Sequence, residues 1–295
     1  MPNTRIAFVG LGAMGSPMAR RLVEAQHHVT GFDMRAEAVS RLVVSGGHGA
    51  ASAAEAAREA DFLVLMVVNA DQADSVLATP GLLGALAPDA TVVVMATCAP
   101  ARIEAMAARV EASGRSFVDA PVSGGMAGAE AGTLTIMAAA PDPLFARVRP
   151  VLLAMGTALF HIGTTPGQGA AMKIVNQLLC GIHIATAAEG LAFAERAGID
   201  PKMALEILSG SAASSWMLKN RGARMIADDG KVASAVDIFV KDLGLVLDAG
   251  QTLRMGLPLA AAAHQLFLAA SGHGAGAKDD SQVIEAYRAL APTTS

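Results

Sequence analysis

The stretch that decides the fold is Ile6–Leu22, IAFVGLGAMGSPMARRL. The apolar run Ile6–Val9 predicts a buried strand, and Met14–Leu22 repeats its apolar residues at the spacing of a helix. Between them stand Gly10, Gly12 and Gly15. A strand, a glycine-rich turn and a helix in this order are typical of a unit that binds a dinucleotide.

Each glycine has a physical role in such a turn. Gly10 permits the tight turn, Gly12 lets the backbone approach a pyrophosphate, and Gly15 lets the helix and the strand pack closely. The N–H groups at the start of the helix add positive partial charge. We therefore predict that the cofactor's phosphates lie against Gly10, Leu11, Gly12, Ala13, Met14 and Gly15. The alternative is a tight turn that binds no ligand.

The second predicted strand, His28–Phe32, is followed by Asp33. A carboxylate at this point can accept a hydrogen bond from a ribose 2′-OH and repels a 2′-phosphate. The predicted cofactor is therefore NAD in preference to NADP, although Arg35 weakens that preference.

Length and composition restrict the class of protein. A chain of 295 residues is long enough for two domains. The net charge is −4 and no cluster of Lys and Arg recurs, so we expect no nucleic-acid partner. The first strand begins close to the initial Met and no apolar run has the length of a membrane span, so we expect a cytoplasmic protein without a membrane partner. The only cysteines are Cys98 and Cys180, whose spacing predicts neither a disulfide nor a metal site.

Strand-like and helix-like stretches alternate in the first half of the chain, which predicts a mostly parallel, doubly wound α/β domain over residues 1–164. The predicted strands are Ile6–Val9, His28–Phe32, Phe62–Val68, Thr91–Met95, Ser116–Asp119, Leu134–Ala138 and Ala158–Ile162. After the linker HIGTTPGQG, which is rich in Gly and Thr, we expect an all-helical domain over residues 165–295. It begins with a long helix that starts near residue 169 and ends at Gly198.

Two further strand ends become polar, and ligands of open α/β sheets bind outside the carboxyl ends of the strands. In MVVNADQ and MATCAP, the residues at these ends are Val67, Val68 and Thr97. We predict that they neighbour the adenosine and the nicotinamide ribose. Ordinary strand termini remain the alternative.

A second glycine-rich stretch, DAPVSGGMAGAEAGTL, places Ser123, Gly124 and Gly125 after a strand. A hydroxyl followed by consecutive glycine N–H groups forms a concave set of donors that suits a carboxylate. The pattern favours a small acidic substrate, with a flexible turn as the alternative.

The long helix opens with GQGAAMKIVNQLL, in which Lys173, Asn176 and Gln177 share one face. A lysine on an apolar helix is either a snorkelling surface residue or a residue with a chemical task. A cofactor loop, a carboxylate turn and this lysine together provide what hydride transfer needs. Lys173 would exchange the proton of the reacting hydroxyl, and Asn176 and Gln177 would orient the hydroxyl and the lysine.

At these residues the chain resembles the β-hydroxyacid dehydrogenase family. The motifs that carry the resemblance are VGLGAMGSPMARRL, FVDAPVSGG, GQGAAMKIVNQLL and VDIFVKDLGLVLD. The resemblance implies the two-domain fold of 6-phosphogluconate dehydrogenase, a catalytic role for Lys173 and a substrate-carboxylate turn at Ser123–Gly125. It also implies that Thr97 and Lys241 approach the cofactor, with Asp248 in the same patch as Lys241. Many members have Asn where this chain has Gln177.

The later stretches HIATAAEGLAFAERAGI, SSWMLKNR and KDDSQVI resemble family members that oxidise the C2 hydroxyl of a four-carbon sugar acid with NAD. Oxidation of 3-hydroxyisobutyrate and reduction of tartronate semialdehyde are the alternatives. Outside hydroxyacid chemistry, the alternatives are a non-catalytic dinucleotide-binding module and an imine reductase, and Lys173 argues against both.

Several other residues lead to weaker expectations. Ser214, Trp216 and Asn220 are candidates to line a pocket for the extra hydroxyls of such a substrate or, alternatively, surface and packing residues. Trp216 and Phe239 are expected to be packing anchors. Asp279 and Asp280 are expected to be solvated or, alternatively, to belong to a chain end that folds back over a pocket. The long apolar helix needs burial beyond its own domain, which favours a homodimer or a homotetramer.

Overall fold

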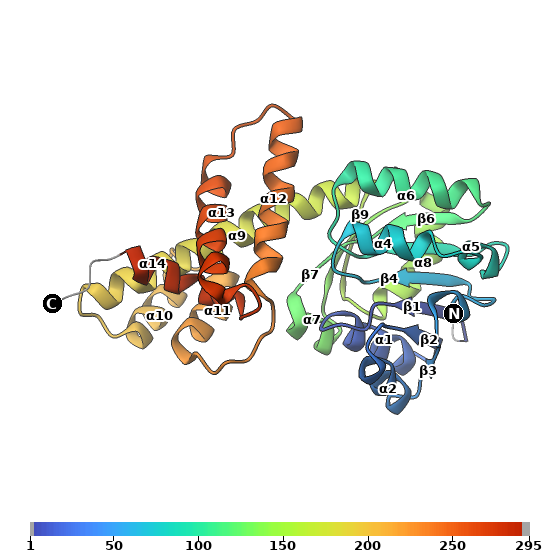
Figure 1. The fold of residues 1–295 in the computed structure, drawn as a ribbon, viewed down its shortest axis with the longest axis horizontal. Coiled ribbons are helices and arrows are strands. Elements are labelled where there is room, and N and C mark those ends of the chain that lie inside the picture. Colours follow the sequence, from blue (N-terminus) through green and yellow to red (C-terminus); the bar gives the residue numbers. More distant parts are fainter. Residues whose placement is uncertain (1–2, 291–295) are drawn as a thin grey trace. The chain divides into compact units, whose positions relative to one another are not determined.

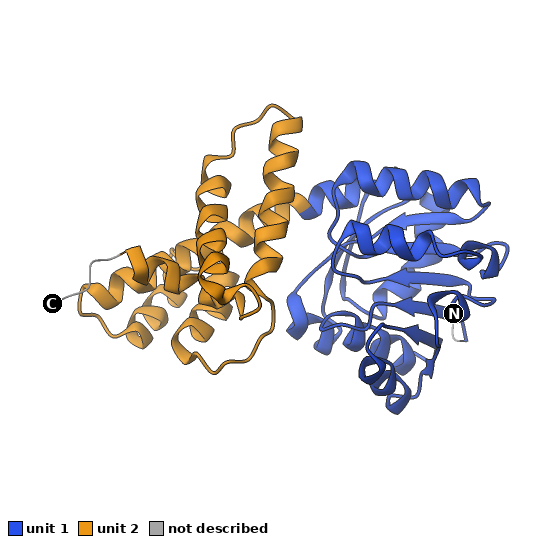
Figure 2. Cartoon of the chain, viewed as in Figure 1, with its two compact units in different colours: residues 1–173 blue, residues 174–295 orange. Residues whose placement is uncertain are grey.

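The computed structural model describes residues 3–290 and divides the chain into two compact units, residues 1–173 and residues 174–295 (Figure 2). Unit 1 carries the nine described strands in a single sheet, and the described part of unit 2 is helical with one isolated β-bridge (Figure 1). A parallel-sheet domain followed by a helical domain confirms the predicted fold class.

The strands of unit 1 form one sheet, and helices connect most of them. The strands are β1 (Arg5–Val9), β2 (His28–Phe32), β3 (His48–Gly49), β4 (Phe62–Leu65), β5 (Thr91–Val94), β6 (Ser116–Asp119), β7 (Val122–Ser123), β8 (Thr135–Ala139) and β9 (Ala158–Gly163). The helices are α1 (Gly15–Glu24), α2 (Ala36–Val44), α3 (Ala53–Ala56), α4 (Ala70–Leu77), α5 (Leu82–Ala85), α6 (Pro100–Ala112), α7 (Gly125–Ala131) and α8 (Asp142–Leu153).

The strand order is β3-β2-β1-β4-β5-β6-β8-β7, with β9 beside β8. The pairs from β3 through β6 are parallel, whereas β8 runs antiparallel to β6 and β7. The chain moves outward from β1 to β2 and β3 and then returns to β4 on the other side of β1. The order of the strands therefore reverses between β1 and β4, which is the point where ligands of such sheets bind.

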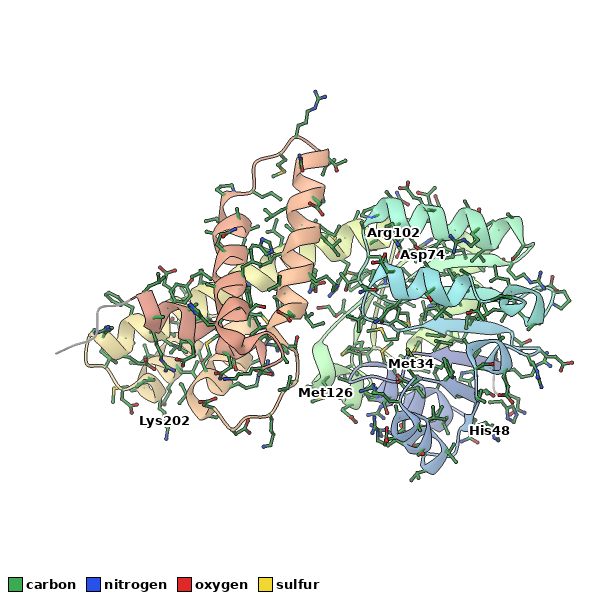
Figure 3. All side chains as sticks on the ribbon, in the orientation of Figure 1. Met34, His48, Asp74, Arg102, Met126 and Lys202 are labelled. Carbon is green, nitrogen blue, oxygen red and sulfur yellow. The ribbon has the colours of Figure 1, made fainter. Side chains whose placement is uncertain are left out.

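Both faces of the sheet are buried. In β1, Ile6 and Phe8 belong to one apolar cluster and Ala7 and Val9 to another. Alternate residues of a strand point to opposite faces, so each cluster fills the space between one face and the helices that cover it. On one side, α4 and α6 are joined by the ion pair of Arg102 and Asp74, 2.5 Å apart and labelled in Figure 3.

The predicted strands are confirmed to within a few residues, and β2 and β6 have the predicted bounds. The clearest error is β4, which ends at Leu65 and not at Val68. Past Met66 the chain leaves the sheet, because the N–H of Val68 donates to the Gln72 side chain and Asn69 caps α4. The short strands β3 and β7 were not predicted.

The long helix α9 (Gln168–Arg196) begins in unit 1 and continues into unit 2. Its first turn belongs to unit 1 and contacts the sheet directly, because a Cβ on Gly169 would lie 2.5 Å from the carbonyl oxygen of Met137 in β8. The predicted domain division at residue 164 stays a prediction.

The other helical segments of unit 2 are α10 (Pro201–Gly210), α11 (Trp216–Ala227), α12 (Val236–Thr252), α13 (Pro258–Ala270), the π-helical turn η1 (Ser271–Ala275), the 3₁₀ turn η2 (Asp280–Val283) and α14 (Ile284–Leu290). Their core gathers Ile184, Leu191, Leu243 and Phe267. Phe239 is a packing anchor as expected, since it is 3% exposed and stacks on Phe267. Trp216 is 53% exposed, so the expectation that it is a packing anchor was wrong.

Among the described residues, α9 alone is long and apolar enough to cross a membrane by length and composition. Lys173, Asn176 and Gln177 interrupt the apolar residues of α9, which is why no run of this length was expected from the sequence. Half of the qualifying window is buried inside the protein, as in the core helix of a soluble protein.

Candidate active site

The glycine-rich loop follows β1, and its glycines are required for different reasons. Gly10 has a φ of +95°, and a Cβ there would lie 2.4 Å from the carbonyl oxygen of Met66. A Cβ on Gly15 would lie 1.8 Å from the carbonyl oxygen of Gly10. The packing of the chain itself therefore requires glycine at both positions.

Gly12 differs from its neighbours. The nearest atom to a Cβ at this position is Nη2 of Arg35, at 3.7 Å, which is an ordinary contact, and the φ of Gly12 lies outside the left-handed region. The fold would accept a side chain here. A glycine that the fold does not need leaves space for the close approach of a ligand, as the predicted contact with a pyrophosphate requires.

Asp33 follows β2 and ties the loop to the next helix. Its Oδ2 accepts the N–H of Leu11 at 2.8 Å, and its Oδ1 accepts the N–H of Arg35 at 2.9 Å. Burial by itself would raise the pKa of Asp33, but the hydrogen bonds from Arg35 and Leu11 outweigh it and hold the pKa below its ordinary value. Asp33 is therefore an anion at neutral pH, as the proposed contact with a ribose hydroxyl requires.

The loops after β4 and β5 flank the glycine-rich loop, since β4 pairs with β1 and β5 pairs with β4. Val67 lies beside Gly10, because its Cγ1 would be 3.1 Å from a Cβ on that glycine. Val68 is 51% exposed, and Thr97 is half-buried between β5 and α6. All three stand at the carboxyl edge of the sheet, where the sequence placed them.

The Ser123–Gly125 turn links β7 to α7. Ser123 is the last residue of β7 and pairs with Thr135 of β8. Gly124 and Gly125 have φ values of +126° and +61°, which favour glycine. The turn was expected directly after a strand, and the strand it follows is the short β7 rather than β6.

Lys173 lies in α9, within unit 1, and is 6% exposed. It lies one turn after the start of α9, where the N–H groups of Gly167 and Ala170 donate to Oδ2 of Asp119 at 3.1 and 2.8 Å. Burial excludes the alternative of a snorkelling surface lysine. Sequence reasoning missed Asp119, although it begins the DAPVSGG motif.

Unit 2 contains a polar cluster that includes other predicted site residues. Nδ2 of Asn176 donates to Oε1 of Gln177 at 2.9 Å, and Nε2 of Gln177 donates to Oδ2 of Asp242. Nζ of Lys241 donates to Oδ1 of the same carboxylate at 2.5 Å. Asp242 is 2% exposed, and through these two hydrogen bonds it holds both Gln177 and Lys241 in place. Asp248 lies two turns further along α12 and is exposed.

The aspartates Asp279 and Asp280 were expected to be solvated, and this was wrong: they are 6% and 0% exposed. Asp280 accepts hydrogen bonds from Nε and Nη2 of Arg221, and Nη1 of Arg224 lies 2.6 Å from Oδ2 of Asp279. Two arginines from α11 neutralise the pair, which is why the pair can be buried.

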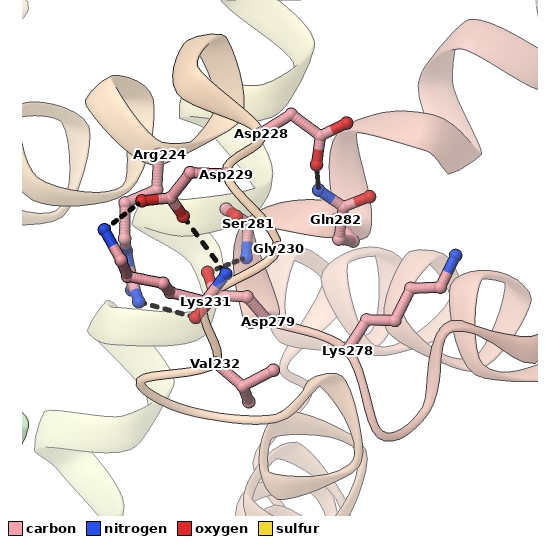
Figure 4. A pocket seen from close by; sticks show the side chains of 10 residues that line it. All are labelled: Arg224, Asp228, Asp229, Gly230, Lys231, Val232, Lys278, Asp279, Ser281 and Gln282. Carbon is pink, nitrogen blue, oxygen red and sulfur yellow. Dashed lines mark hydrogen bonds and ion pairs between the residues drawn. The ribbon is translucent and has the colours of Figure 1, made fainter.

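Beside this network, unit 2 has a cavity of about 280 Å³ (Figure 4). It is lined by Arg224, Asp228, Asp229, Gly230, Lys231, Val232, Lys278, Asp279, Ser281 and Gln282. None of the predicted site residues lines it.

Asn220 accepts a hydrogen bond from Arg221 at 2.7 Å, and the Arg221 guanidinium lies over the ring of Trp216, 5.7 Å from its centre. Both side chains are thus engaged with Arg221, and a pocket for substrate hydroxyls stays a prediction for them and Ser214.

Within residues 3–290, no group of three or more His, Cys, Asp or Glu side chains could hold a metal ion. Of the two cysteines, Cys98 is buried and Cys180 is half-buried.

Comparisons with known proteins agree with this architecture. Residues 5–163 match the model of the NAD binding domain of 6-phosphogluconate dehydrogenase, and residues 167–287 match that of the NAD-binding domain of NADP-dependent 3-hydroxyisobutyrate dehydrogenase. The chain is 41% identical to the L-threonate dehydrogenase of Cupriavidus necator over 97% of this chain and 96% of that protein. It is 40% identical to the L-threonate dehydrogenase of Escherichia coli K12 over 97% and 95% of the two chains.

Among solved structures, a 3-hydroxyisobutyrate dehydrogenase from Salmonella typhimurium superposes with a TM-score of 0.91 at 41% identity, covering 96% of this chain and 99% of the other. The fold and the dinucleotide loop define an NAD-dependent oxidoreductase. The chain belongs to the β-hydroxyacid dehydrogenase family, whose members include the 3-hydroxyisobutyrate dehydrogenases, and it is an NAD-dependent hydroxyacid dehydrogenase.

Proposed function

We propose that this enzyme oxidises the C2 hydroxyl of L-threonate to the 2-oxo acid, 2-oxo-tetronate. Two relatives at 41% and 40% identity that are named L-threonate dehydrogenase support this substrate, which has one carboxylate and several hydroxyls. The solved relative at 41% identity is named for the alternative substrate, 3-hydroxyisobutyrate. The observation that carries the proposed chemistry is the burial of Lys173 at the start of α9, in the same compact unit as the glycine-rich loop.

In the proposed site, the loop from Gly10 to Gly15 holds the pyrophosphate, and Asp33 accepts a hydrogen bond from the ribose. When bound, NAD accepts the hydride from the hydroxyl-bearing carbon. Val67, Val68 and Thr97 line the cofactor's path along the carboxyl edge of the sheet.

The substrate needs two further groups from the chain. Ser123 and the N–H groups of Gly124 and Gly125 bind the substrate carboxylate, which fixes the reacting carbon. Lys173 takes the proton of the hydroxyl as the C–H bond breaks, so that the alcohol loses one hydride and one proton and becomes a ketone. Gln177, one turn later on α9, is a positioning residue, because its amide is bonded to Asp242.

The substrate is tested by steady-state oxidation of L-threonate and 3-hydroxyisobutyrate, and by reduction of tartronate semialdehyde, followed through NADH absorbance. We expect the highest kcat/KM with L-threonate. A higher kcat/KM with either smaller acid would contradict the proposed substrate and leave the class of reaction intact.

The role of Lys173 is tested by Lys173→Ala, with Lys202→Ala as the matched control, because Lys202 is an exposed lysine of α10 (Figure 3). Loss of a general acid–base group lowers turnover by about 10² to 10⁴-fold, while NADH binding, measured by fluorescence, should be retained. Near-normal turnover of Lys173→Ala would defeat the mechanism. A wild-type protein that binds NADH and oxidises no hydroxy acid would instead support the non-catalytic binding module.

We further propose that the enzyme is cytoplasmic, has no nucleic-acid or membrane partner, and forms a homodimer or a homotetramer. Val175, Leu179 and Phe193 of α9 are 50%, 49% and 75% exposed, so this helix leaves apolar surface that a second copy would cover. Light scattering after size-exclusion chromatography tests the assembly. A monomer at micromolar concentration would contradict it.

A further inference from the structure

The buried carboxylate of Asp119 has no role in the chemistry described so far. Asp119 is the last residue of β6 and is 0% exposed. Its Oδ2 accepts the N–H groups of Gly167 and Ala170, which are among the donors that a helix leaves unpaired at its start. A side chain 48 residues before Gly167 in the sequence therefore caps α9.

A second observation, independent of the cap, fixes the same helical turn. A Cβ on Gly169 would lie 2.5 Å from the carbonyl oxygen of Met137 and 3.0 Å from that of Asp119. The start of α9 thus touches the backbone at the end of β6 and in the middle of β8, with no room for a side chain between them. The first turn of the helix can take only one position against these strands.

Lys173 follows Gly169 by four residues, so the two positions share one face of α9. Side chains on a helix slant toward its N-terminus and cover the preceding turn. The lysine side chain therefore projects over the turn that Asp119 and Gly169 fix. In the other direction along the chain, Asp119 precedes Ser123 by four residues, and the segment between them leads into the proposed carboxylate turn.

We propose that Asp119 is a positioning residue, which holds the first turn of α9 at the end of β6 and thereby sets Lys173 relative to the Ser123–Gly125 turn. This role rests on the proposed function of Lys173. In this role Asp119 transfers neither the proton nor the hydride, and it acts through the position of the helix.

A carboxylate suits this position better than another capping group. The positive end of the helix dipole favours an anion, and one oxygen accepts two N–H groups at once. The other oxygen, Oδ1, is buried and has no hydrogen-bond partner among the described residues. An amide at this position keeps the shape of the side chain but removes the negative charge that faces the positive end of the helix, so the cap is weaker.

The test uses the full-length variants Asp119→Asn and Gly169→Ala. The first weakens the cap with an isosteric side chain, and the second keeps the carboxylate but crowds the helix start against Met137 and Asp119. The matched control is Asp200→Asn, because Asp200 is an exposed helix cap that accepts the N–H of Lys202 at 3.1 Å in unit 2. We measure kcat and KM for the hydroxy acid, the Kd of NADH by fluorescence, and the melting temperature.

For both variants in unit 1, we expect kcat per folded molecule to fall by about tenfold to a hundredfold, because small misplacement of a catalytic group has effects of this size. The Kd of NADH should change by less than about twofold, since the glycine-rich loop lies on other elements, and Asp200→Asn should retain wild-type kcat. A purely structural cap would lower the melting temperature and leave kcat per folded molecule unchanged.

If the wild type is active and the variants show a lower melting temperature with unchanged kcat per folded molecule, the positioning role is overturned and the proposed function still stands. A wild-type enzyme that oxidises no hydroxy acid would overturn the proposed function and the positioning role together. If Asp119→Asn does not fold, the kcat of Gly169→Ala decides.

Discussion

The glycine-rich loop offers a prediction in which stability and binding change in opposite directions. Gly12→Ala adds a Cβ whose nearest neighbour is 3.7 Å away, at a backbone conformation that alanine adopts without strain. The variant should therefore gain about 0.4 to 1 kcal/mol of stability, because alanine restricts the unfolded chain. The same methyl group occupies the space that a pyrophosphate needs.

The loss of binding can be estimated from the contacts at stake. If the methyl group displaces the pyrophosphate from one loop N–H, the lost charge-assisted hydrogen bond is worth about 1.5 to 3 kcal/mol. The Kd of NADH should then rise by about tenfold to a hundredfold. Fluorescence titration with NADH and a urea unfolding curve on the same preparation measure both effects.

The matched control for this prediction is Gly84→Ala. Gly84 lies in α5, and a Cβ there has no heavy atom within 4 Å. We expect the same gain in stability and an unchanged Kd. An unchanged Kd in Gly12→Ala as well would refute the reasoning that position 12 is glycine because of a ligand.

Three further predictions concern buried carboxylates. Burial raises the pKa of Asp119 to about 6 from its ordinary value of 3.8. Between these pH values the folded protein holds a proton that the unfolded chain lacks, so the free energy of unfolding rises as the pH falls. Relative to Asp119→Asn, the wild type should gain up to about 3 kcal/mol of stability as the pH falls from about 7 to about 4. Urea unfolding at both pH values measures this, and parallel pH dependences would contradict it. Arg221→Met removes the bidentate partner of the fully buried Asp280 and leaves it Arg224, so the free energy of unfolding should fall by about 1.5 to 3 kcal/mol; a loss below about 1 kcal/mol in urea would contradict the importance of the pair. Asp242→Asn replaces an acceptor of the Lys241 ammonium by an amide, and kcat/KM for the hydroxy acid should fall by about tenfold or more. Unchanged steady-state kinetics would show that the cluster does not position the site.

The sequence predicted the elements that repeat a local pattern. The glycine-rich loop, β2 and β6 follow from hydrophobic runs bounded by glycine or charge, and each was placed correctly. The end of β4 was misplaced, because Met66, Val67 and Val68 continue an apolar run. What ends the strand is a hydrogen bond from the Val68 N–H to a side chain in the next helix, which apolar periodicity does not encode.

Residues whose roles depend on distant partners could not be predicted. Asp119 reads as an ordinary strand terminus, since the N–H groups it caps are 48 and 51 residues away. Asp280 reads as a solvated loop charge, and its burial depends on Arg221, 59 residues earlier. The burial of Lys173 is likewise a tertiary property, so its sequence alone left a surface lysine as an alternative.

The two outer strands of the sheet differ in how they meet solvent. At one edge, β3 has two residues, which offer few unpaired backbone groups to another molecule. At the other, β9 has six residues, pairs with β8 alone among the described strands, and leaves Phe160 56% exposed. Intermolecular strand addition, the first step of β-rich aggregation, is therefore directed to β9. An engineered form of this enzyme meant for storage at high concentration would gain most from a charged residue in place of Phe160.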